Sequence, residues 1–458
     1  MKGDDGYDPN NAEFAAKFHE WHPDDGPAEP KPKPQAEPGP GGVSLDDFVA
    51  YMPLHTYIFI PTREMWATPS VNARIPNPAK GLKANAWLDK NRPVEQMTWA
   101  PGEPLMIRDK LIAEGGWFPR PDSTVLNLYL PPMITPKPGS VGLWIDHVYR
   151  LFPEGGDHVI WWLAHRVQKP HEKINHALVL GGAPGVGKDT ILEPVKQAIG
   201  PWNFAEVSPK QVLGRFNGFL KSVILRISEA RDLGDFDRFA FYDHTKTLTA
   251  APPDVLRVDE KNLREHYVPN LCGVIITTNH KADGIYLPAD DRRHFVAWSS
   301  AMLNDFAGGH FHKLYGWYAN GGIEAVAAYL ADLDLSSFDP KAPPPKTGAF
   351  WEIVNASRAP EDAELADALD KLGFPEAVTL QMVANAADAE FSPRLLDHKN
   401  RRQIPHRMEK CGYTPVHNDV AKDGLWKVSG KRQVVYAKQE LSVHARLAAA
   451  SALAAGGQ

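Results

Sequence analysis

The chain has 458 residues, of which 43% are hydrophobic and 23% are charged, as in ordinary globular proteins. At roughly 150 residues per domain, this length allows about three domains. No apolar run reaches the roughly 18 residues that a membrane span needs, and the N-terminus lacks the apolar core of a secretory signal. The two cysteines, Cys272 and Cys411, have no partners at metal-ligand spacing, so we expect a reduced, cytoplasmic protein that is not bound to a membrane.

Residues 1–42 are predicted to be a disordered acidic tail. They hold nine acidic and four basic residues, a net charge of −5 out of −6 for the whole chain. Pro27–Gly42 contains six prolines and three glycines, with almost nothing to bury. The remaining residues are therefore close to neutral, and the overall negative charge does not argue against nucleic-acid binding.

Residues 43–145 are predicted to form a small α+β domain. Tyr57–Pro61 has the composition of a strand, and Leu105–Glu114 has helical spacing. No cluster of catalytic residue types occurs in this region of the sequence, so we expect a structural or docking role for it.

Residues 146–335 are predicted to form an α/β domain with a parallel sheet, because strand-like and helical segments alternate there. Asp157–Val167 has helical periodicity. The predicted strands are His176–Leu180, Ser222–Ile227 and Gly273–Thr278. A proline-rich linker at 336–349 ends the domain.

A glycine-rich loop follows the first of these strands and precedes a helix that we expect from Lys188 onward. In such a loop, backbone N–H groups surround phosphate oxygens, the helix N-terminus adds positive potential, and the lysine reaches the outer phosphates. The strand–loop–helix context predicts a P-loop that binds ATP and Mg²⁺. The predicted nucleotide-binding residues are Gly182, Ala183, Pro184, Gly185, Val186, Gly187, Lys188, Asp189 and Thr190.

The predicted magnesium ligands depart from the usual P-loop pattern. A Ser or Thr normally follows the lysine, and an Asp–Glu pair normally ends the second strand. Here Asp189 follows the lysine, and the strand ends in Ser228 and Glu229, of which Glu229 is predicted to activate the attacking water. One hypothesis is that carboxylate and hydroxyl have exchanged places, so that Asp189 and Ser228 bind the metal. The alternative is that Thr190 or water serves the metal and Asp189 only caps the helix.

Two further segments are predicted to act on the γ-phosphate. Asn279 ends the third strand, where its amide can orient the attacking water. Arg292 and Arg293 follow Asp290 and Asp291, and adjacent arginines cannot both face the same way. One arginine is predicted to reach the γ-phosphate of a neighbouring subunit, and the other to pair with one of these acids. The alternative is a surface cluster of ion pairs.

The order of these motifs resembles superfamily 3 helicases, and more narrowly the helicase part of phage and viral primase–helicases, which are AAA+-like ring ATPases. The matching segments are Gly182–Thr190, Ile224–Ala230, Val274–Asn279 and Asp291–Arg293. The resemblance implies a homo-oligomeric ring, for which we suspect a hexamer, acting on single-stranded or forked DNA. It also implies a primase partner, but residues 1–145 lack an acid cluster typical of a primase, so that activity is lost or separately encoded.

The same family carries a basic hairpin between the second and third strands, facing the central channel of the ring. In this interval the resemblance makes Lys261 the first candidate for contact with DNA phosphates and Lys246 the second.

Residues 350–440 are predicted to form a winged-helix-like DNA-binding domain, followed by an Ala/Gly-rich tail at 441–458. Its third helix, Asp397–Lys410, is basic, and a strand hairpin is expected around Ser429–Arg432. A basic helix beside a basic hairpin fits binding in a DNA groove with backbone contacts, although a solvated face of a protein-docking domain is the alternative. The predicted DNA-binding residues here are Arg401, Arg402, Arg407, Lys431 and Arg432.

We therefore predict an ATP-dependent DNA helicase or translocase that acts in replication of phage, prophage or plasmid DNA. The first alternative is an initiator or loader that uses ATP as a switch without unwinding DNA. The second is a nucleotide or small-molecule kinase, which would need neither the basic hairpin nor the arginine that acts between subunits.

Overall fold

The computed structural model describes residues 42–228, 234–281, 285–306, 308–356, 360–388, 391–396 and 404–456. The chain divides into two compact units. The first consists of residues up to 98 together with 105–111 and 118–128, and the second contains the rest. Almost all of the predicted acidic tail lies outside the described residues.

The first unit contains a four-stranded sheet with the strand order β3-β2-β1-β4. Its central strand, β1, is buried along its whole length and pairs antiparallel with β2 and parallel with β4. Two short helices cover the sheet and share its hydrophobic core. The elements are β1 (Phe48–Tyr51), β2 (Thr56–Phe59), β3 (Glu64–Trp66), β4 (Pro93–Val94), α2 (Thr68–Arg74) and α3 (Ala84–Asn91).

The segment predicted as a helix over Leu105–Glu114 is a strand. β6 (Met106–Ala113) lies next to β7 (Gly116–Asn127) in a three-stranded sheet with β5 (Gln96–Thr98). Asp109 has a left-handed φ of 59°, and its carboxylate accepts a hydrogen bond of 2.9 Å from the backbone N–H of Asp122. Cross-strand hydrogen bonds of this kind override the helical spacing of the side chains.

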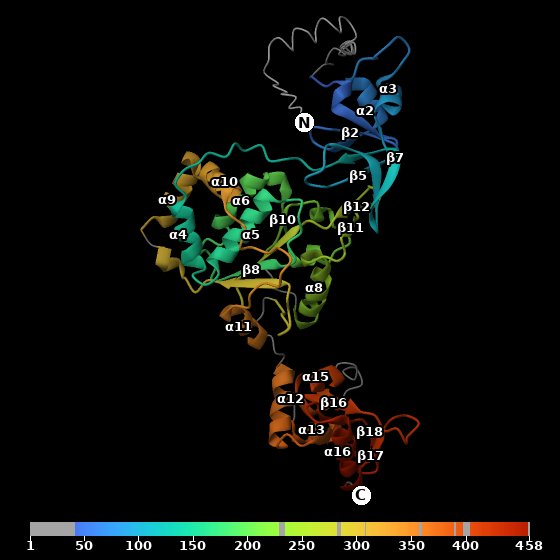
Figure 1. Cartoon of the computed structure of the whole chain (residues 1–458), viewed down its shortest axis with the longest axis vertical. Helices are drawn as coiled ribbons and strands as arrows, with labels where there is room; N and C mark the ends of the chain where they lie inside the picture. Colours follow the sequence, from blue (N-terminus) through green and yellow to red (C-terminus); the bar gives the residue numbers. More distant parts are fainter. Residues whose placement is uncertain are drawn as a thin grey trace, which may run out of the picture. The chain divides into compact units, whose positions relative to one another are not determined.

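The second unit contains a five-stranded parallel sheet with the order β14-β8-β13-β10-β9 (Figure 1). The predicted α/β class with a parallel sheet is thus confirmed, and β8, β10 and β13 are the three predicted strands. β8 and β13 are buried throughout, as expected for central strands covered on both faces. The strands are β8 (Ala177–Gly181), β9 (Phe204–Val207), β10 (Ile224–Ile227), β13 (Gly273–Thr278) and β14 (His294–Trp298).

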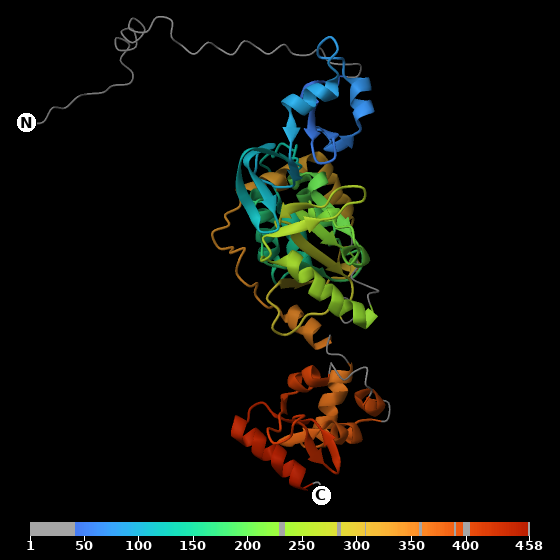
Figure 2. The ribbon, with the colours of Figure 1, turned by 90° about the vertical axis from the view of Figure 1, so that its right-hand side faces the viewer.

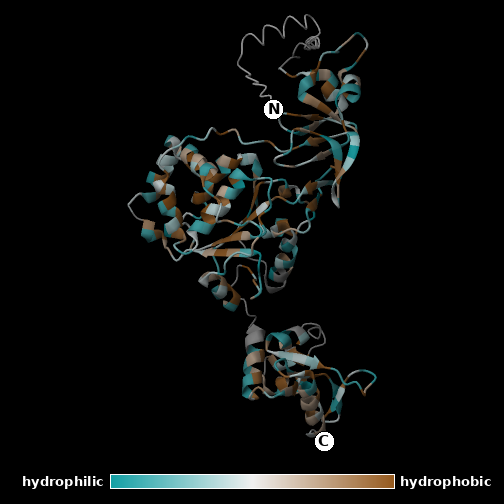
Figure 3. Ribbon diagram, in the orientation of Figure 1, coloured by the Kyte–Doolittle hydropathy of each residue, from teal (hydrophilic) through white to brown (hydrophobic). Residues whose placement is uncertain are grey.

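Helices surround this sheet. α5 (Gly156–Gln168), α6 (Glu193–Ile199) and α10 (Ile323–Asp332) pack against one another, whereas α8 (Gly234–Thr249) contacts β13 and α11 (Gly348–Ala356) contacts β14 (Figure 1). Hydrophobic and hydrophilic residues both occur along each of these helices, as expected for helices that bury one apolar side (Figure 3). The other helices here are α4 (Gly142–Leu151), α7 (Pro209–Val212) and α9 (His310–Trp317).

One glycine lets helix α5 approach the sheet closely. A Cβ atom added at Gly273, the first residue of β13, would lie 2.7 Å from Cδ of Arg166 and 2.9 Å from the Trp162 ring. Both side chains belong to α5 and are fully buried. A larger residue at this position would therefore push the helix away from the centre of the sheet.

A separate two-stranded hairpin, β11 (Val255–Val258) with β12 (His266–Pro269), lies between β10 and β13 in the sequence (yellow-green in Figure 2). It occupies the interval in which a basic hairpin is expected. Within the described ranges, none of the helices combines the length and apolar character needed to cross a membrane.

The C-terminal part of the second unit is built from helices, a three-stranded antiparallel sheet of order β15-β19-β16, and a hairpin. The hairpin pairs β17 with β18 through Ser429 and Gly430, whose φ angles of 51° and 76° suit a two-residue turn. The elements are α12 (Pro360–Lys371), β15 (Ala377–Thr379), α13 (Leu380–Ala386), α14 (Phe391–Leu396), α15 (Ile404–Lys410), β16 (Tyr413–Val416), β17 (Trp426–Val428), β18 (Lys431–Gln433) and β19 (Val435–Lys438).

The segment predicted as an Ala/Gly-rich tail is a helix, α16 (Val443–Gly456). Alanine has the strongest intrinsic helix propensity, and the helix buries Ala450 completely against residues of β15, β16, β17 and β19. Leu447 and Leu453 pack against the same cluster. The alanine-rich composition therefore reflects close helix packing.

Candidate nucleotide-binding site

The predicted P-loop follows the carboxyl end of β8, and its shape depends on glycine. Gly182, Gly185 and Gly187 have φ angles of 144°, 77° and 91°, which residues with a Cβ rarely adopt. A Cβ at Gly182 would lie 2.7 Å from that of Ser299, and one at Gly187 would lie 2.6 Å from Nε2 of His147. The glycines thus let the backbone of the loop curl tightly, as that of a phosphate-binding loop does.

The helix after the loop begins later than expected from the sequence. Lys188 and Asp189 lie in a turn, Thr190–Leu192 form a 3₁₀ turn, and α6 begins at Glu193. Pro194 has no N–H to donate to the carbonyl of Thr190, and the hydroxyl of Tyr318 donates to that oxygen instead at 3.0 Å. The proline therefore delays the regular α-helix.

Lys188 connects the loop to the third predicted strand. Its Nζ donates to the carbonyl oxygens of Gly182 and Ala183 and to Oδ1 of Asn279, each at 2.8 Å. Lys188 is 7% exposed, and burial lowers the pKa of its ammonium group. Asn279 directly follows β13, which is the neighbour of β8, so the strand order brings these two predicted residues together.

A pocket of about 440 Å³ opens beside this contact. Seven of its lining residues belong to the predicted site, and five do not. The predicted ones are Pro184, Gly185, Gly187, Lys188, Asp189, Thr190 and Asn279, and the others are Arg226, Thr277, Thr278, Phe311 and Tyr315.

Three of the unpredicted residues change the chemistry of the pocket. Arg226 lies within β10, and its Nη2 is 2.6 Å from Oδ1 of Asp189. A charged residue inside an apolar strand was the sequence signal that could have found it. Phe311 and Tyr315 lie four residues apart on α9, hence on one face, and the Tyr315 hydroxyl is 3.1 Å from Oγ1 of Thr190. Nothing in the sequence alone assigns this helix to the pocket.

Of the three residues predicted to bind magnesium, two line the pocket and one does not. Asp189 makes no capping hydrogen bond and instead pairs with Arg226, so the helix-capping alternative does not describe it. Thr190 borders the pocket, whereas Ser228, just after β10, is not among the lining residues. Carboxylate and hydroxyl oxygens suit Mg²⁺, so Asp189 and Thr190 fit the ion provided that the carboxylate leaves Arg226. Glu229 lies outside the described residues.

A pair of histidines supports the loop from behind. Nε2 of His147 lies 3.1 Å from the carbonyl oxygen of Gly187, and its Nδ1 lies 3.0 Å from Nε2 of His310. His147 can donate to the loop and accept from His310 only while it is neutral. Burial lowers its pKa to about 4, so the neutral form prevails near neutral pH.

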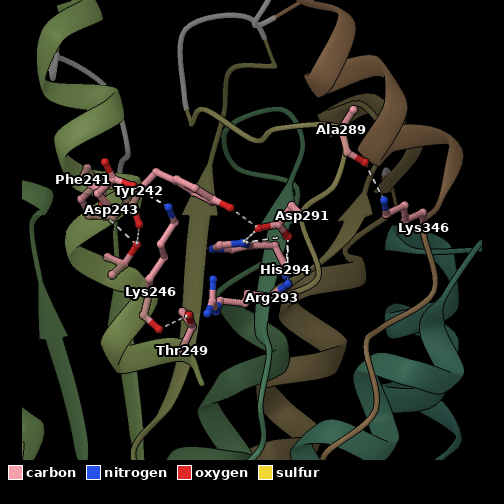
Figure 4. Close-up of polar contacts among 11 residues, drawn as sticks. Phe241, Tyr242, Asp243, Lys246, Thr249, Ala289, Asp291, Arg293, His294 and Lys346 are labelled. Atoms are coloured by element: carbon pink, nitrogen blue, oxygen red, sulfur yellow. Dashed lines mark hydrogen bonds and ion pairs between the residues drawn. The ribbon is translucent and has the colours of Figure 1, made fainter. Parts of the chain in front are cut away.

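Arg292 and Arg293 directly follow Asp291, which holds the backbone of this segment in place; Arg293, Asp291 and His294 are seen in Figure 4. Asp291 accepts the backbone N–H groups of Arg293 and His294 at 3.0 and 2.9 Å and the Tyr242 hydroxyl at 2.8 Å. Although burial alone would raise it, hydrogen bonds from His294 and Tyr242 hold the pKa of Asp291 at about 2. Asp291, one of the two acids offered as the partner of an arginine, thus pairs with His294 instead, at 3.1 Å.

Arg292 and Arg293 face different surroundings, as their adjacency requires. Arg292 is exposed and has no ion-pair partner in the described part of the chain. Arg293 is half-buried, and its Nε has no hydrogen-bond partner among the described residues. Arg292 is therefore the one positioned to reach another molecule.

Lys261 and Arg264 lie at the tip of the β11–β12 hairpin and are exposed. The acidic residues beside them are already paired, Asp259 with Arg215 at 2.9 Å and Glu260 with Lys221 at 2.5 Å. The tip therefore presents positive charge.

Lys246, the second candidate of this interval, lies on α8. It pairs with Asp243 at 2.5 Å and lies 4.6 Å from the centre of the Tyr242 ring (Figure 4). It is thus engaged within its own helix and is not part of the hairpin.

Of the predicted C-terminal DNA contacts, Arg401 and Arg402 lie outside the described residues. Arg407 is half-buried on α15. Lys431 and Arg432 are exposed on β18, where Arg432 pairs with Asp423 at 3.2 Å. The basic hairpin tip is therefore present, and within the described residues Lys431 has no ion-pair partner there.

Comparison with known proteins finds a family model that matches part of the chain and solved structures that match most of it. A family of unknown function (DUF5906) matches residues 180–293, which include the predicted P-loop, β10 and β13. Among curated proteins, none matches the chain.

Solved structures extend the comparison to most of the chain. The apo structure of the NrS-1 C-terminal region (305–718) is similar with a TM-score of 0.57 and 16% identity, covering 85% of this chain and 95% of that one. A second apo form of that region gives 0.56. A JCV helicase with a bound small molecule matches with a TM-score of 0.29 and 13% identity over 57% of this chain and 68% of its own, which is too distant to establish a common fold. The chain thus shares the fold of the NrS-1 C-terminal region.

Proposed function

We propose that this chain is an ATP-dependent DNA helicase or translocase of the phage primase–helicase type, acting in the replication of phage, prophage or plasmid DNA. The observation that carries the proposal is the contact of Lys188 with Asn279 and two loop carbonyls, at the mouth of a 440 Å³ pocket. A lysine that closes a glycine loop onto a polar residue of the neighbouring strand suits a site that senses a phosphate.

In this proposal, ATP displaces the internal partners of Lys188. Phosphate oxygens replace the carbonyl oxygens of Gly182 and Ala183 as acceptors for its ammonium group. Asn279 is then released to orient the attacking water, and Glu229 removes its proton. Bound Mg²⁺, held by Asp189 and Thr190, would neutralise charge on the phosphates.

Phe311 and Tyr315 give the same pocket an aromatic side. Their rings come from one face of α9, and the Tyr315 hydroxyl contacts Thr190 beside the loop. Aromatic side chains are suited to contact with a nucleobase or ribose. We assign them to the nucleoside part of ATP.

The coupling to DNA rests on residues outside the pocket. Lys261 and Arg264 present unpaired positive charge at the hairpin tip, where DNA phosphates would bind. Arg292 would complete the ATP site of a neighbouring subunit in a homo-oligomeric ring, for which we suspect a hexamer. The C-terminal domain, as a winged-helix-like module, would add contacts through Arg401, Arg402, Arg407, Lys431 and Arg432.

The test is ATPase activity and particle size of the full chain, with and without single-stranded and forked DNA. We expect DNA-stimulated turnover, an ATP-dependent oligomer and strand displacement, all lost in Lys188→Ala. Lys196→Ala, a lysine on α6 that does not line the pocket, is the matched control. A monomer whose ATPase ignores DNA would refute the proposal, and turnover without displacement would favour a loader.

A further inference from the structure

Arg226 enters the pocket from the middle of β10, and the proposed mechanism gives it no role. It pairs in register with Glu206 on β9 and Ile275 on β13, and its side chain is only 14% exposed. Removing a charge from water to this extent is unfavourable unless partners compensate for it. Its surroundings should therefore reveal what it binds.

The three nitrogens of the Arg226 guanidinium are unequally satisfied. Nη2 lies 2.6 Å from Oδ1 of Asp189, and Nη1 lies 3.5 Å from Oε1 of Glu206. Nε is buried and has no hydrogen-bond partner within the described residues. Both carboxylates are partly exposed, with side chains 62% and 48% accessible. Only the Asp189 contact is short enough to hold the guanidinium firmly.

Asp189 stands where two cations compete for it. It directly follows Lys188, at the loop position where a magnesium ligand is expected, and its present partner is Arg226. Mg²⁺ binds carboxylate oxygens in preference to neutral donors. When Asp189 turns to the metal, Arg226 is left beside the phosphates that Lys188 binds. Its planar fork of donors matches phosphate oxygens.

We propose that Arg226 is a second phosphate-binding cation of this site, held by Asp189 until magnesium and nucleotide enter together. Without nucleotide, Asp189 and Arg226 neutralise each other. With nucleotide, Asp189 turns to Mg²⁺ and Arg226 turns to the β- or γ-phosphate, so each charge keeps an opposite partner. The inference rests on the proposed nucleotide binding. It adds a residue that makes the affinity depend on the number of phosphates in the nucleotide.

The experiment measures the dissociation constants of AMP, ADP and ATP for the full chain by calorimetry, with and without Mg²⁺. AMP lacks the outer phosphates and cannot make this contact. Arg226→Met should therefore weaken the binding of ATP by about tenfold or more and the binding of AMP by less than about twofold. Arg226→Lys should restore part of the ATP affinity. Lys196→Met is the control, since Lys196 lies 4.0 Å from the same Glu206 but does not line the pocket.

Asp189→Asn tests the exchange itself. This substitution releases Arg226 and removes a metal ligand. Without Mg²⁺, the variant should therefore bind ATP at least as tightly as wild type does. Added Mg²⁺ should raise the ATP affinity of the variant only slightly. Equal losses for AMP, ADP and ATP in Arg226→Met, or an unchanged ATP affinity, would overturn the inference. If Arg226→Met does not fold, Arg226→Lys and Asp189→Asn decide it. Wild type that binds no nucleotide would instead defeat the proposed function.

Discussion

Some residues that line the pocket are predicted from the sequence, and others are found only in the structure. The spacing of the glycine loop predicts Lys188, and the end of the third strand predicts Asn279, because both lie in continuous motifs. Arg226 and Tyr315 could not be assigned in the same way. Arg226 stands out in the sequence only as a charge inside an apolar strand, and the roles of both residues depend on which side chains the strand order and α9 bring to the loop.

The proposed role of Asn279 can be tested by the kinetics of ATP hydrolysis. Asn279→Ala should lower the kcat of ATP hydrolysis by about a hundredfold, because the attacking water loses its orienting amide. KM should change little, since Lys188 keeps its two loop carbonyls as partners until phosphate replaces them. Steady-state ATPase kinetics measure both constants. Equal kcat in mutant and wild type would mean that Asn279 only holds Lys188.

The proposed contact of Tyr315 with the nucleoside can be tested by ATP binding. If its ring contacts the nucleoside, Tyr315→Ala should weaken ATP binding by about fivefold, in line with roughly 1 kcal/mol for an aromatic contact. Tyr315→Phe keeps the ring and loses only the hydroxyl that lies 3.1 Å from Thr190, so it should bind nearly as wild type. Titration with a fluorescent ATP analogue compares them. Similar losses in both variants would assign the effect to the hydroxyl.

Among the elements, the three inner strands of the parallel sheet are predicted correctly from the sequence, whereas the start of α6, the strand β6 and the helix α16 are not. β8, β10 and β13 are short apolar runs bounded by polar residues, and their burial on both faces makes them recognisable. The helix after the glycine loop begins late because Pro194 lacks an N–H. The side-chain spacing of β6 predicts a helix, because its pairing with β7 leaves no trace in that spacing. The predicted tail became α16 because alanine-rich sequence suits both a flexible tail and a tightly packed helix.

The packing of α16 is testable with two neighbouring alanines. Ala450 is completely buried against the C-terminal sheet, and Ala448 on the same helix is exposed. Ala450→Asp places a charge in an apolar cluster and should destabilise the C-terminal part of the chain by about 3 kcal/mol or more. Ala448→Asp should change its stability by less than about 0.5 kcal/mol. Urea unfolding followed by circular dichroism would show this, and equal effects would contradict the helix packing.

At the scale of the whole molecule, buried histidines make stability depend on pH. Burial lowers the pKa of His147, His158, His165 and His266 to about 4, and that of His176 to about 3. Nε2 of His158 and Nε2 of His176 lie 2.9 Å apart, so one must donate and the other must accept. A proton on both nitrogens would remove the acceptor and place two charges together.

The sign of the effect follows from these values. Well above pH 6.5 the histidines are neutral in both the folded and the unfolded chain, and they add no pH dependence. Between about pH 6.5 and 4 the unfolded chain binds protons that the folded chain excludes, so the free energy of unfolding falls as pH falls, by several kcal/mol in all. His158→Phe keeps a ring against Phe295, whose centre is 3.9 Å away, and removes one such group. Denaturation at pH 7, 6 and 5 should therefore give this variant a flatter dependence than wild type. His312→Phe, at an exposed position on α9, should follow wild type, and identical slopes for all three proteins would show that burial of His158 does not couple folding to pH.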